Sequence, residues 1–154
     1  MTRHRTRPQH GSAIVEFALV LPILLLLLGG LYGVGRAYAQ YETLTKATRD
    51  GARLLSITSK AAINSTGVAA AKARVTLMAQ NGGMPDFSDA NVIVTCLDAG
   101  TYADGNCVDG IEPGGVRVET TGWTYDLGST MPILGKATRT LSLKASTTMR
   151  YMHP

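Results

Sequence analysis

The 154-residue sequence lacks the short motifs that mark common enzyme active sites. It contains no G-x-S-x-G nucleophile motif, no phosphate-binding P-loop and no H-E-x-x-H zinc motif. Its three histidines are His4, His10 and His153, and none lies where packing would hold a catalytic base. The sequence therefore predicts a protein that is not an enzyme and that needs no cofactor, metal or small-molecule substrate.

A basic stripe is also missing, although the formal net charge is +4. Beyond the N-terminal arginines, lysine and arginine are scattered among acidic residues. No aromatic side chains are interleaved with them as in RNA-binding modules. We therefore expect no nucleic-acid partner.

Charged side chains are absent from residues 17–35. About 20 predominantly apolar residues cross a bilayer, and residues 12–35 supply them if Glu16 is tolerated. Three arginines precede the segment, whereas only Arg36 flanks its far end; the three are Arg3, Arg5 and Arg7. The positive-inside rule then predicts a single-pass protein with a cytoplasmic N-terminus and an extracytoplasmic C-terminal part.

Three interpretations of this segment remain open. Ala37-Tyr38-Ala39 resembles a signal-peptidase site, but the apolar block is longer than a usual signal and Arg36 precedes the supposed cut. Alternatively, the segment is a plain signal anchor whose Glu16 reaches the membrane surface at little cost. In the third, the chain is cut after Gly11, and Ser12 becomes the new N-terminus, one helical turn from Glu16. A carboxylate in a membrane is tolerated beside an opposite charge, such as the amine of a neighbouring copy.

The residues around this cut resemble a known family. A basic leader precedes Gly11 and Ser12; Glu16 is the fifth residue after the cut, Phe17 follows, and the next stretch is rich in leucine. This pattern is similar to type IV prepilins. The segments GSAIVEFALVLPILLLLL and GVGRAYAQYETLTKATRDGARL resemble the TadE/TadG-like pseudopilins of the tight-adherence (Flp pilus) system. No long insertion typical of large TadG proteins is present, so the small TadE type fits best.

This resemblance implies a bacterial inner-membrane protein that a prepilin peptidase processes and that helps to assemble a pilus. Its expected partners are the inner membrane, the peptidase, other pilins or pseudopilins, and platform proteins of the pilus assembly. The expected roles are cleavage at Gly11 and Ser12, and assembly or processing through Glu16 and Phe17.

Beyond the apolar segment the pattern predicts an α+β fold. Apolar residues recur at helical spacing to about Leu55, and a second helix is expected over about 65–80. Residues then alternate with a period of two near 92–97, 116–121 and 141–149. These predict a small antiparallel sheet packed on the long helix, as the pilin resemblance also implies.

The charged patch at residues 49–53 allows two interpretations. Gly51 and Ala52 would let a partner helix approach closely. The ordinary alternative, slightly favoured here, is that this helix packs on its own domain while Arg49 and Arg53 face solvent.

Only two cysteines occur, Cys96 and Cys107. They form no C-x-x-C pair and have no second pair or nearby histidine, which argues against redox or metal chemistry. On the extracytoplasmic side a disulfide persists, and one closing so short a loop would contribute about 3 kcal/mol. The acidic residues near this loop do not match the EF-hand spacing, so we expect a solvated loop; they are Asp98, Asp104, Asp109 and Glu112.

These observations divide the chain into a basic leader at 1–11, a transmembrane and stalk helix at 12–57, and an extracytoplasmic α+β domain at 58–154. The alternative function is a signal-anchored binding or sensor module with an uncut leader and the acidic loop as its ligand site.

Overall fold

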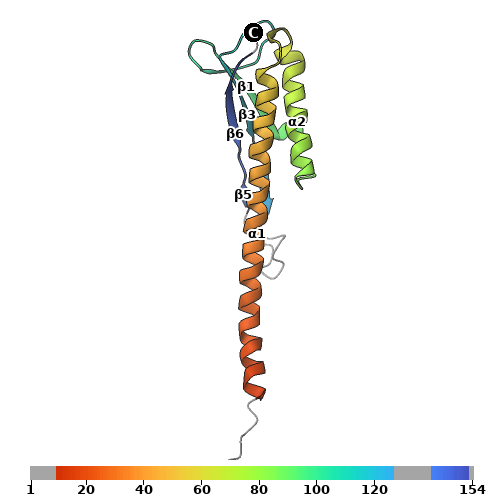
Figure 1. Cartoon of the computed structure of the whole chain (residues 1–154), viewed down its shortest axis with the longest axis vertical. Coiled ribbons are helices and arrows are strands. Elements are labelled where there is room, and N and C mark those ends of the chain that lie inside the picture. The colour runs from red at the N-terminus through yellow and green to blue at the C-terminus, as the bar shows by residue number, and fades with distance from the viewer. Residues whose placement is uncertain (1–9, 127–139, 153–154) are drawn as a thin grey trace, which may run out of the picture.

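A computed structural model describes residues 10–126 and 140–152. Its dominant element is α1, a helix of 47 residues from His10 to Ser56 (Figure 1). Pro22 lies inside the helix without ending it, and the helix stops one residue beyond the predicted Leu55. Thr43 and Thr45 each donate their hydroxyl to the carbonyl four residues earlier, so these polar side chains are satisfied within the helix.

The second helix, α2 (Val68–Asn81), lies beside the C-terminal half of α1 (Figure 1). A 3-10 turn at Lys60–Ala62 and a π-helical turn at Ile63–Gly67 precede it. The predicted helix is therefore confirmed, but its expected first residue, Ser65, lies in the π-helical turn. At the other end Gly83 has a φ of 87°, and this conformation, which glycine adopts easily, ends the helix.

A four-stranded antiparallel sheet in the order β2-β1-β3-β6 forms the third part. Its strands are β1 (Val92–Leu97), β2 (Asp104–Gly105), β3 (Gly115–Thr120) and β6 (Ser146–Arg150). The central register places Val94 opposite Val118 and Cys96 opposite Val116. A separate ribbon pairs β4 (Thr124–Asp126) with β5 (Thr140–Ser142). The α+β class with a long apolar N-terminal helix is confirmed.

One predicted strand is wrong in its extent, because residues 141–149 form two strands in different sheets. β5 pairs with β4 and β6 pairs with β3, so the chain changes partner between them. At this break the Thr120 side chain accepts a hydrogen bond from the Ala145 amide at 2.9 Å, and the Leu143 amide donates to the Trp123 carbonyl. On the other side of this break Gly122, between β3 and β4, has a φ of 69°, which glycine adopts easily.

The core lies between the sheet and the two helices. Gly51 of α1 is buried at their junction, close to Val75 of α2 and Val118 of β3. The largest fully buried side chains come from every part of the domain and include Leu44, Leu55, Ile63, Val75, Phe87 and Val116. The C-terminal half of α1 is therefore the central element of the core.

Candidate membrane and assembly helix

The N-terminal half of α1 projects beyond the sheet and α2 (Figure 1). Among the described residues, α1 is the one helix that is long and apolar enough to cross a membrane. No part of its most apolar 18-residue window is buried. Its exposed apolar side chains include Ile14, Leu19, Ile23, Leu27 and Leu31. At 1.5 Å per residue, residues 13–35 extend over about 35 Å, which matches a hydrocarbon core of about 30 Å. Side chains that water would disfavour here suit contact with lipid.

The predicted processing and assembly residues all lie near the start of α1. The helix begins at His10, so the bond between Gly11 and Ser12 lies in its first turn. Ser12 and Glu16 are four residues apart, a spacing that places two positions on one helix face about 5–6 Å apart. The side chains of Glu16 and Phe17 are exposed. The four predicted residues thus lie within two turns of α1, and their roles in processing and assembly stay predictions.

The predicted disulfide is present between Cys96 and Cys107. Cys96 is the fifth residue of β1, and Cys107 follows β2 in a loop that returns to β3. This loop lies at the end of the domain remote from the start of α1 (Figure 1). The two sets of predicted residues are therefore far apart and do not form one site.

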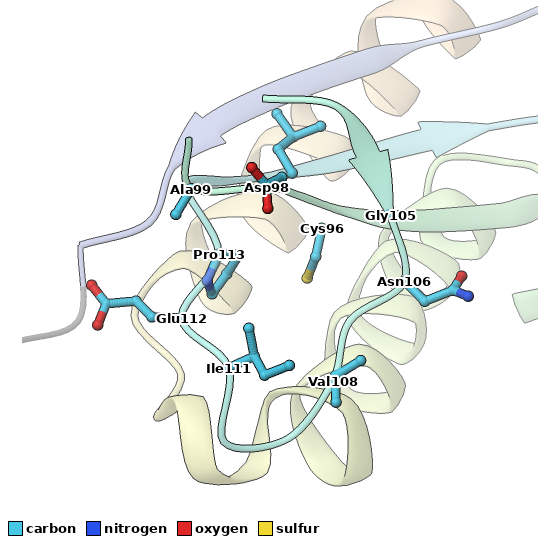
Figure 2. Close-up of a pocket in the computed structure, with 10 residues that line it drawn as sticks. Cys96, Asp98, Ala99, Gly105, Asn106, Val108, Ile111, Glu112 and Pro113 are labelled. Carbon is cyan, nitrogen blue, oxygen red and sulfur yellow. The ribbon is translucent and has the colours of Figure 1, made fainter. Parts of the chain in front are cut away.

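A shallow pocket of about 250 Å³ opens inside the disulfide-closed loop (Figure 2). Leu97, Val108 and Pro113 contribute apolar walls. Figure 2 shows Ile111 directed into the ring of the loop, whereas Asn106 and Glu112 point away from it. The pocket thus presents mainly apolar atoms and few polar groups that could orient a ligand.

The acidic residues of this loop are engaged within the chain. The Asp98 carboxylate accepts hydrogen bonds from the amides of Gly100 and Thr101, at 2.9 and 2.8 Å. Asp104 pairs with Arg117 at 2.8 Å, and Glu112 lies 3.3 Å from the Lys60 amine. These contacts hold the loop in shape and do not converge on one point. Within the described residues no group of three or more potential ligands could hold a metal ion.

Asp109 has a structural role that sequence reasoning missed. Its carboxylate accepts hydrogen bonds from the backbone amides of Asn64, at 2.7 Å, and Ser65, at 3.2 Å. These amides open the π-helical turn, so Asp109 caps this turn from a distant part of the chain. The hydrogen bond from Asn64 lowers the pKa of Asp109, and those from Thr101 and Gly100 lower the pKa of Asp98. No sequence pattern reveals a cap about 45 residues away.

The patch at residues 49–53 packs on its own domain. A side-chain carbon added at Gly51 would lie 2.7 Å from a Val75 methyl group and 3.4 Å from the Ala71 carbonyl. Asp50 pairs with Arg74 of α2 at 2.7 Å. Arg49 and Arg53 are exposed, as the favoured interpretation predicted. The small residues therefore serve contact between α1 and α2, and a partner helix does not occupy this seam.

These features define a class of protein: an α+β domain built on the second half of a long helix whose first half is apolar and exposed. The model of the TadE-like protein family matches residues 11–53 of this chain. The match confirms the family resemblance and covers the predicted cleavage bond, the apolar segment and most of the packed half of α1. No curated protein and no solved structure matches the chain.

Proposed function

We propose that this chain is a TadE-type pseudopilin that takes part in assembling a Tad (Flp) pilus. One observation carries the proposal: the TadE-like match over residues 11–53 lies on a single continuous helix whose first half exposes apolar side chains. Such a helix can associate with others in a membrane while its attached domain contacts pilus components outside it. The role is structural, so no catalytic group is required.

In the proposed organisation, residues 1–11 form a basic leader that remains in the cytoplasm. Residues 12–57 form the transmembrane and stalk helix, and residues 58–154 form the extracytoplasmic domain. The basic leader and the single arginine after the apolar segment support this orientation. In bacteria the membrane is then the inner membrane. The remaining partners are the prepilin peptidase, other pilins or pseudopilins, and the assembly platform.

The proposed processing step cuts the bond between Gly11 and Ser12. This bond lies in the first turn of α1, where backbone amides have no helical partner. Opening that turn for a peptidase therefore costs little compared with opening the middle of the helix. After the cut, Ser12 carries a free amine, and Glu16 lies one turn along the same face. The amine of a neighbouring subunit then neutralises the Glu16 carboxylate and fixes the register between the two helices, with Phe17 beside them.

The mass of the N-terminal peptide of the protein purified from membranes tests the processing step. We expect the mature chain to begin at Ser12. A chain that begins at Met1 would instead support the signal-anchored binding module with an uncut leader. A chain that begins at Gln40 would show that the segment is a cleaved secretory signal.

Substitution of Glu16 tests the assembly step. We expect Glu16→Ala and Glu16→Gln to weaken subunit association in membranes at least about tenfold, because removing one partner of a desolvated ion pair costs about 3–5 kcal/mol. The control is Lys46→Ala, since Lys46 lies on the same helix but pairs with Glu42 on the exposed surface. Co-purification of differently tagged copies and pilus assembly provide the readouts. If both Glu16 variants assemble as well as the control, the amine does not pair with this carboxylate.

The binding-module alternative makes a different prediction for a chimera. If the acidic loop were a ligand site, function would survive replacement of residues 12–35 by an unrelated membrane anchor. Because Asp98, Asp104 and Asp109 already have partners within the chain, we expect the chimera to be inactive in pilus assembly.

A further inference from the structure

The junction between the apolar segment and the domain contains no spacer. Arg36 is the first charged residue after the uncharged stretch at 17–35. The next residue, Ala37, has only 5% of its surface exposed and belongs to the main core cluster. Gln40, one turn further along, is 6% exposed. The domain therefore begins within one residue of the point where the apolar segment ends.

Domain backbone also lies alongside this junction. The Gln40 side-chain amide donates a hydrogen bond to the Gly83 carbonyl at 3.4 Å. A side-chain carbon at Gly83 would lie 3.9 Å from the guanidinium of Arg36. The turn after α2 thus reaches the Arg36 guanidinium, and Figure 1 shows β5 extending further towards the apolar half of α1 than α2 does. If the apolar segment spans the bilayer, this base of the domain lies at the headgroups.

The side chains around Arg36 are of the kinds that prefer this interface. Tyr32, Tyr38 and Tyr41 expose 61%, 62% and 42% of their surfaces. At 100° per residue, Tyr32 and Arg36 share one side of α1, whereas Tyr38 and Tyr41 lie on the opposite side. Tyrosine is enriched at both membrane–water interfaces because its ring suits the headgroup layer while its hydroxyl suits water.

Two of these tyrosines have hydroxyl partners that lie on the domain side of the ring, away from the apolar segment. Arg36 donates a hydrogen bond to the Tyr32 hydroxyl at 3.5 Å. The Glu42 carboxylate accepts a hydrogen bond from Tyr38, which raises the pKa of that phenol. Arg36 and Glu42 both lie four residues towards the domain from the tyrosine they contact. Each ring therefore lies nearer the apolar segment than its hydroxyl partner, as expected at a membrane surface.

Arg36 retains donors for a further partner. The contact with Tyr32 uses one of its five N–H groups, and within the described part of the chain no carboxylate pairs with it. A guanidinium binds phosphate oxygens in a fork geometry. Lipid phosphates are the anions that meet a side chain at the end of a membrane-spanning helix.

We propose that Arg36, Tyr32, Tyr38 and Tyr41 form a collar that binds lipid headgroup phosphates, so that the domain rests directly on the membrane. This inference depends on the membrane-spanning role of residues 13–35 in the proposed function. It goes further by naming lipid headgroups as the partner of the domain's base. A domain held in this way presents its lateral surfaces to partners at a fixed height above the bilayer.

Headgroup-attached nitroxide lipids test this seating by quenching tryptophan fluorescence. The full chain is placed in nanodiscs that contain phosphatidylcholine and phosphatidylglycerol. Trp123 is the single tryptophan, so Trp123→Phe gives a background for new reporters. Leu141→Trp introduces a reporter on the exposed face of β5 at the base, and Ile111→Trp introduces one in the remote disulfide loop. We expect quenching at the base to exceed that in the loop at least threefold.

Charge substitutions in the Leu141→Trp reporter chain test the role of Arg36. We expect Arg36→Gln to reduce quenching about twofold or more, whereas Arg53→Gln, an exposed arginine higher on the same helix, leaves it unchanged. Because Trp123 packs on Phe87 at a ring distance of 5.8 Å, its replacement could disturb folding. The unsubstituted chain therefore gives a second reading: Trp123 should be quenched more by headgroup nitroxides than by nitroxides at the middle of the acyl chain.

The outcomes separate this inference from the proposed function. A chain that does not integrate into nanodiscs contradicts the membrane-spanning role itself. Equal quenching of an integrated chain at the base and in the loop overturns the seating and leaves the proposed function standing. Quenching at the base that does not depend on Arg36 overturns the phosphate contact.

Discussion

Gly51 lies where α1 meets both α2 and β3, and its lack of a side chain lets these elements approach. A side-chain carbon at this position would be 2.7 Å from one Val75 methyl group and 3.8 Å from one of Val118. Both valines are fully buried, so neither has room to move aside. The sequence indicated that a small residue serves packing here, but only the structure shows that the neighbours belong to the same chain.

We expect Gly51→Ala to destabilise the domain by about 1–3 kcal/mol, as is typical of overpacking in a close-packed core. The better helix propensity of alanine, about 1 kcal/mol, offsets only part of this loss. Urea unfolding of the full chain in detergent measures the change. Gly35→Ala is the control, because an added carbon there meets no atom within 4 Å. Equal loss of stability in both variants would contradict the packing argument.

At the residue scale Asp109 links the disulfide loop to the turn before α2. Its carboxylate accepts hydrogen bonds from the backbone amides of Asn64 and Ser65, which α2 itself does not satisfy. These hydrogen bonds favour the ionised form of the carboxylate. Because the folded-state pKa of Asp109 is lowered, its stabilising effect is fully present above the unfolded-state value of about 3.9. The effect is lost as the pH falls through the lower folded-state value.

Asp109→Asn should therefore lower the unfolding temperature at neutral pH. The difference between this variant and the native chain should stay constant down to about pH 4 and then shrink as the native carboxylate takes up a proton. Thermal unfolding followed by circular dichroism between pH 7 and pH 3 measures it. A difference that persists unchanged at pH 3 would show that Asp109 does not act through its charge.

At the scale of elements, the loop between β1 and β3 depends on its disulfide. It leaves the sheet at Leu97, forms the short strand β2 and returns at Gly115. Many of its side chains are exposed, so burial contributes little to its order. Cross-linking residues 11 positions apart removes disorder from the unfolded chain, and this effect compensates for the small apolar core of the loop.

Replacing both cysteines, in Cys96→Ser with Cys107→Ser, should cost about 3 kcal/mol of unfolding free energy. Urea unfolding of the double variant measures the loss. The native chain under reducing conditions should lose a similar amount, which controls for the serine hydroxyls. Unchanged stability in both experiments would show that the loop is ordered by its other contacts.

The break between β5 and β6 shows where element prediction from sequence fails. Leu141, Leu143 and Ala145 alternate with polar residues without interruption, so the pattern predicts one strand. The break arises because Thr120 binds the Ala145 backbone while Trp123 binds that of Leu143. These partners lie about 20 or more residues away in sequence. By contrast, β1 agrees with its prediction at both ends, because its own apolar residues set its limits.

At the scale of the whole molecule, one helix serves two environments. Its first half exposes apolar side chains over the length of a bilayer, and its second half supplies Leu44, Ala47, Ala52 and Leu55 to the domain core. The sequence pattern predicted a boundary at residue 58, between the transmembrane and stalk helix and the extracytoplasmic domain. The buried side chains, however, tie residues 37–56 to the strands and to α2.

Two truncations test this dependence. A chain that begins at residue 35 should fold as a water-soluble domain, since it keeps the packed half of α1. A chain that begins at residue 58 should not fold, because losing several buried side chains costs about 2–5 kcal/mol for each leucine, against a typical total of 5–15 kcal/mol. Gel filtration, disulfide content and thermal unfolding provide the measurements. Cooperative unfolding of the shorter chain would contradict this account.

The sequence by itself determined the features that depend on neighbouring residues. It specified the apolar segment, the long helix, the central strands, the pairing of two lone cysteines and the TadE-like arrangement around Gly11, Ser12, Glu16 and Phe17. Each follows from composition or spacing within a few turns of chain.

Only the tertiary structure decided which surfaces meet. The structure shows that Gly51 packs within its own chain, that residues 141–149 belong to two sheets, and that Asp109 caps a turn far away in sequence. It also placed the base of the domain beside Arg36, with no spacer above the apolar segment. These outcomes depend on packing and hydrogen bonds between distant segments, and no local pattern encodes them.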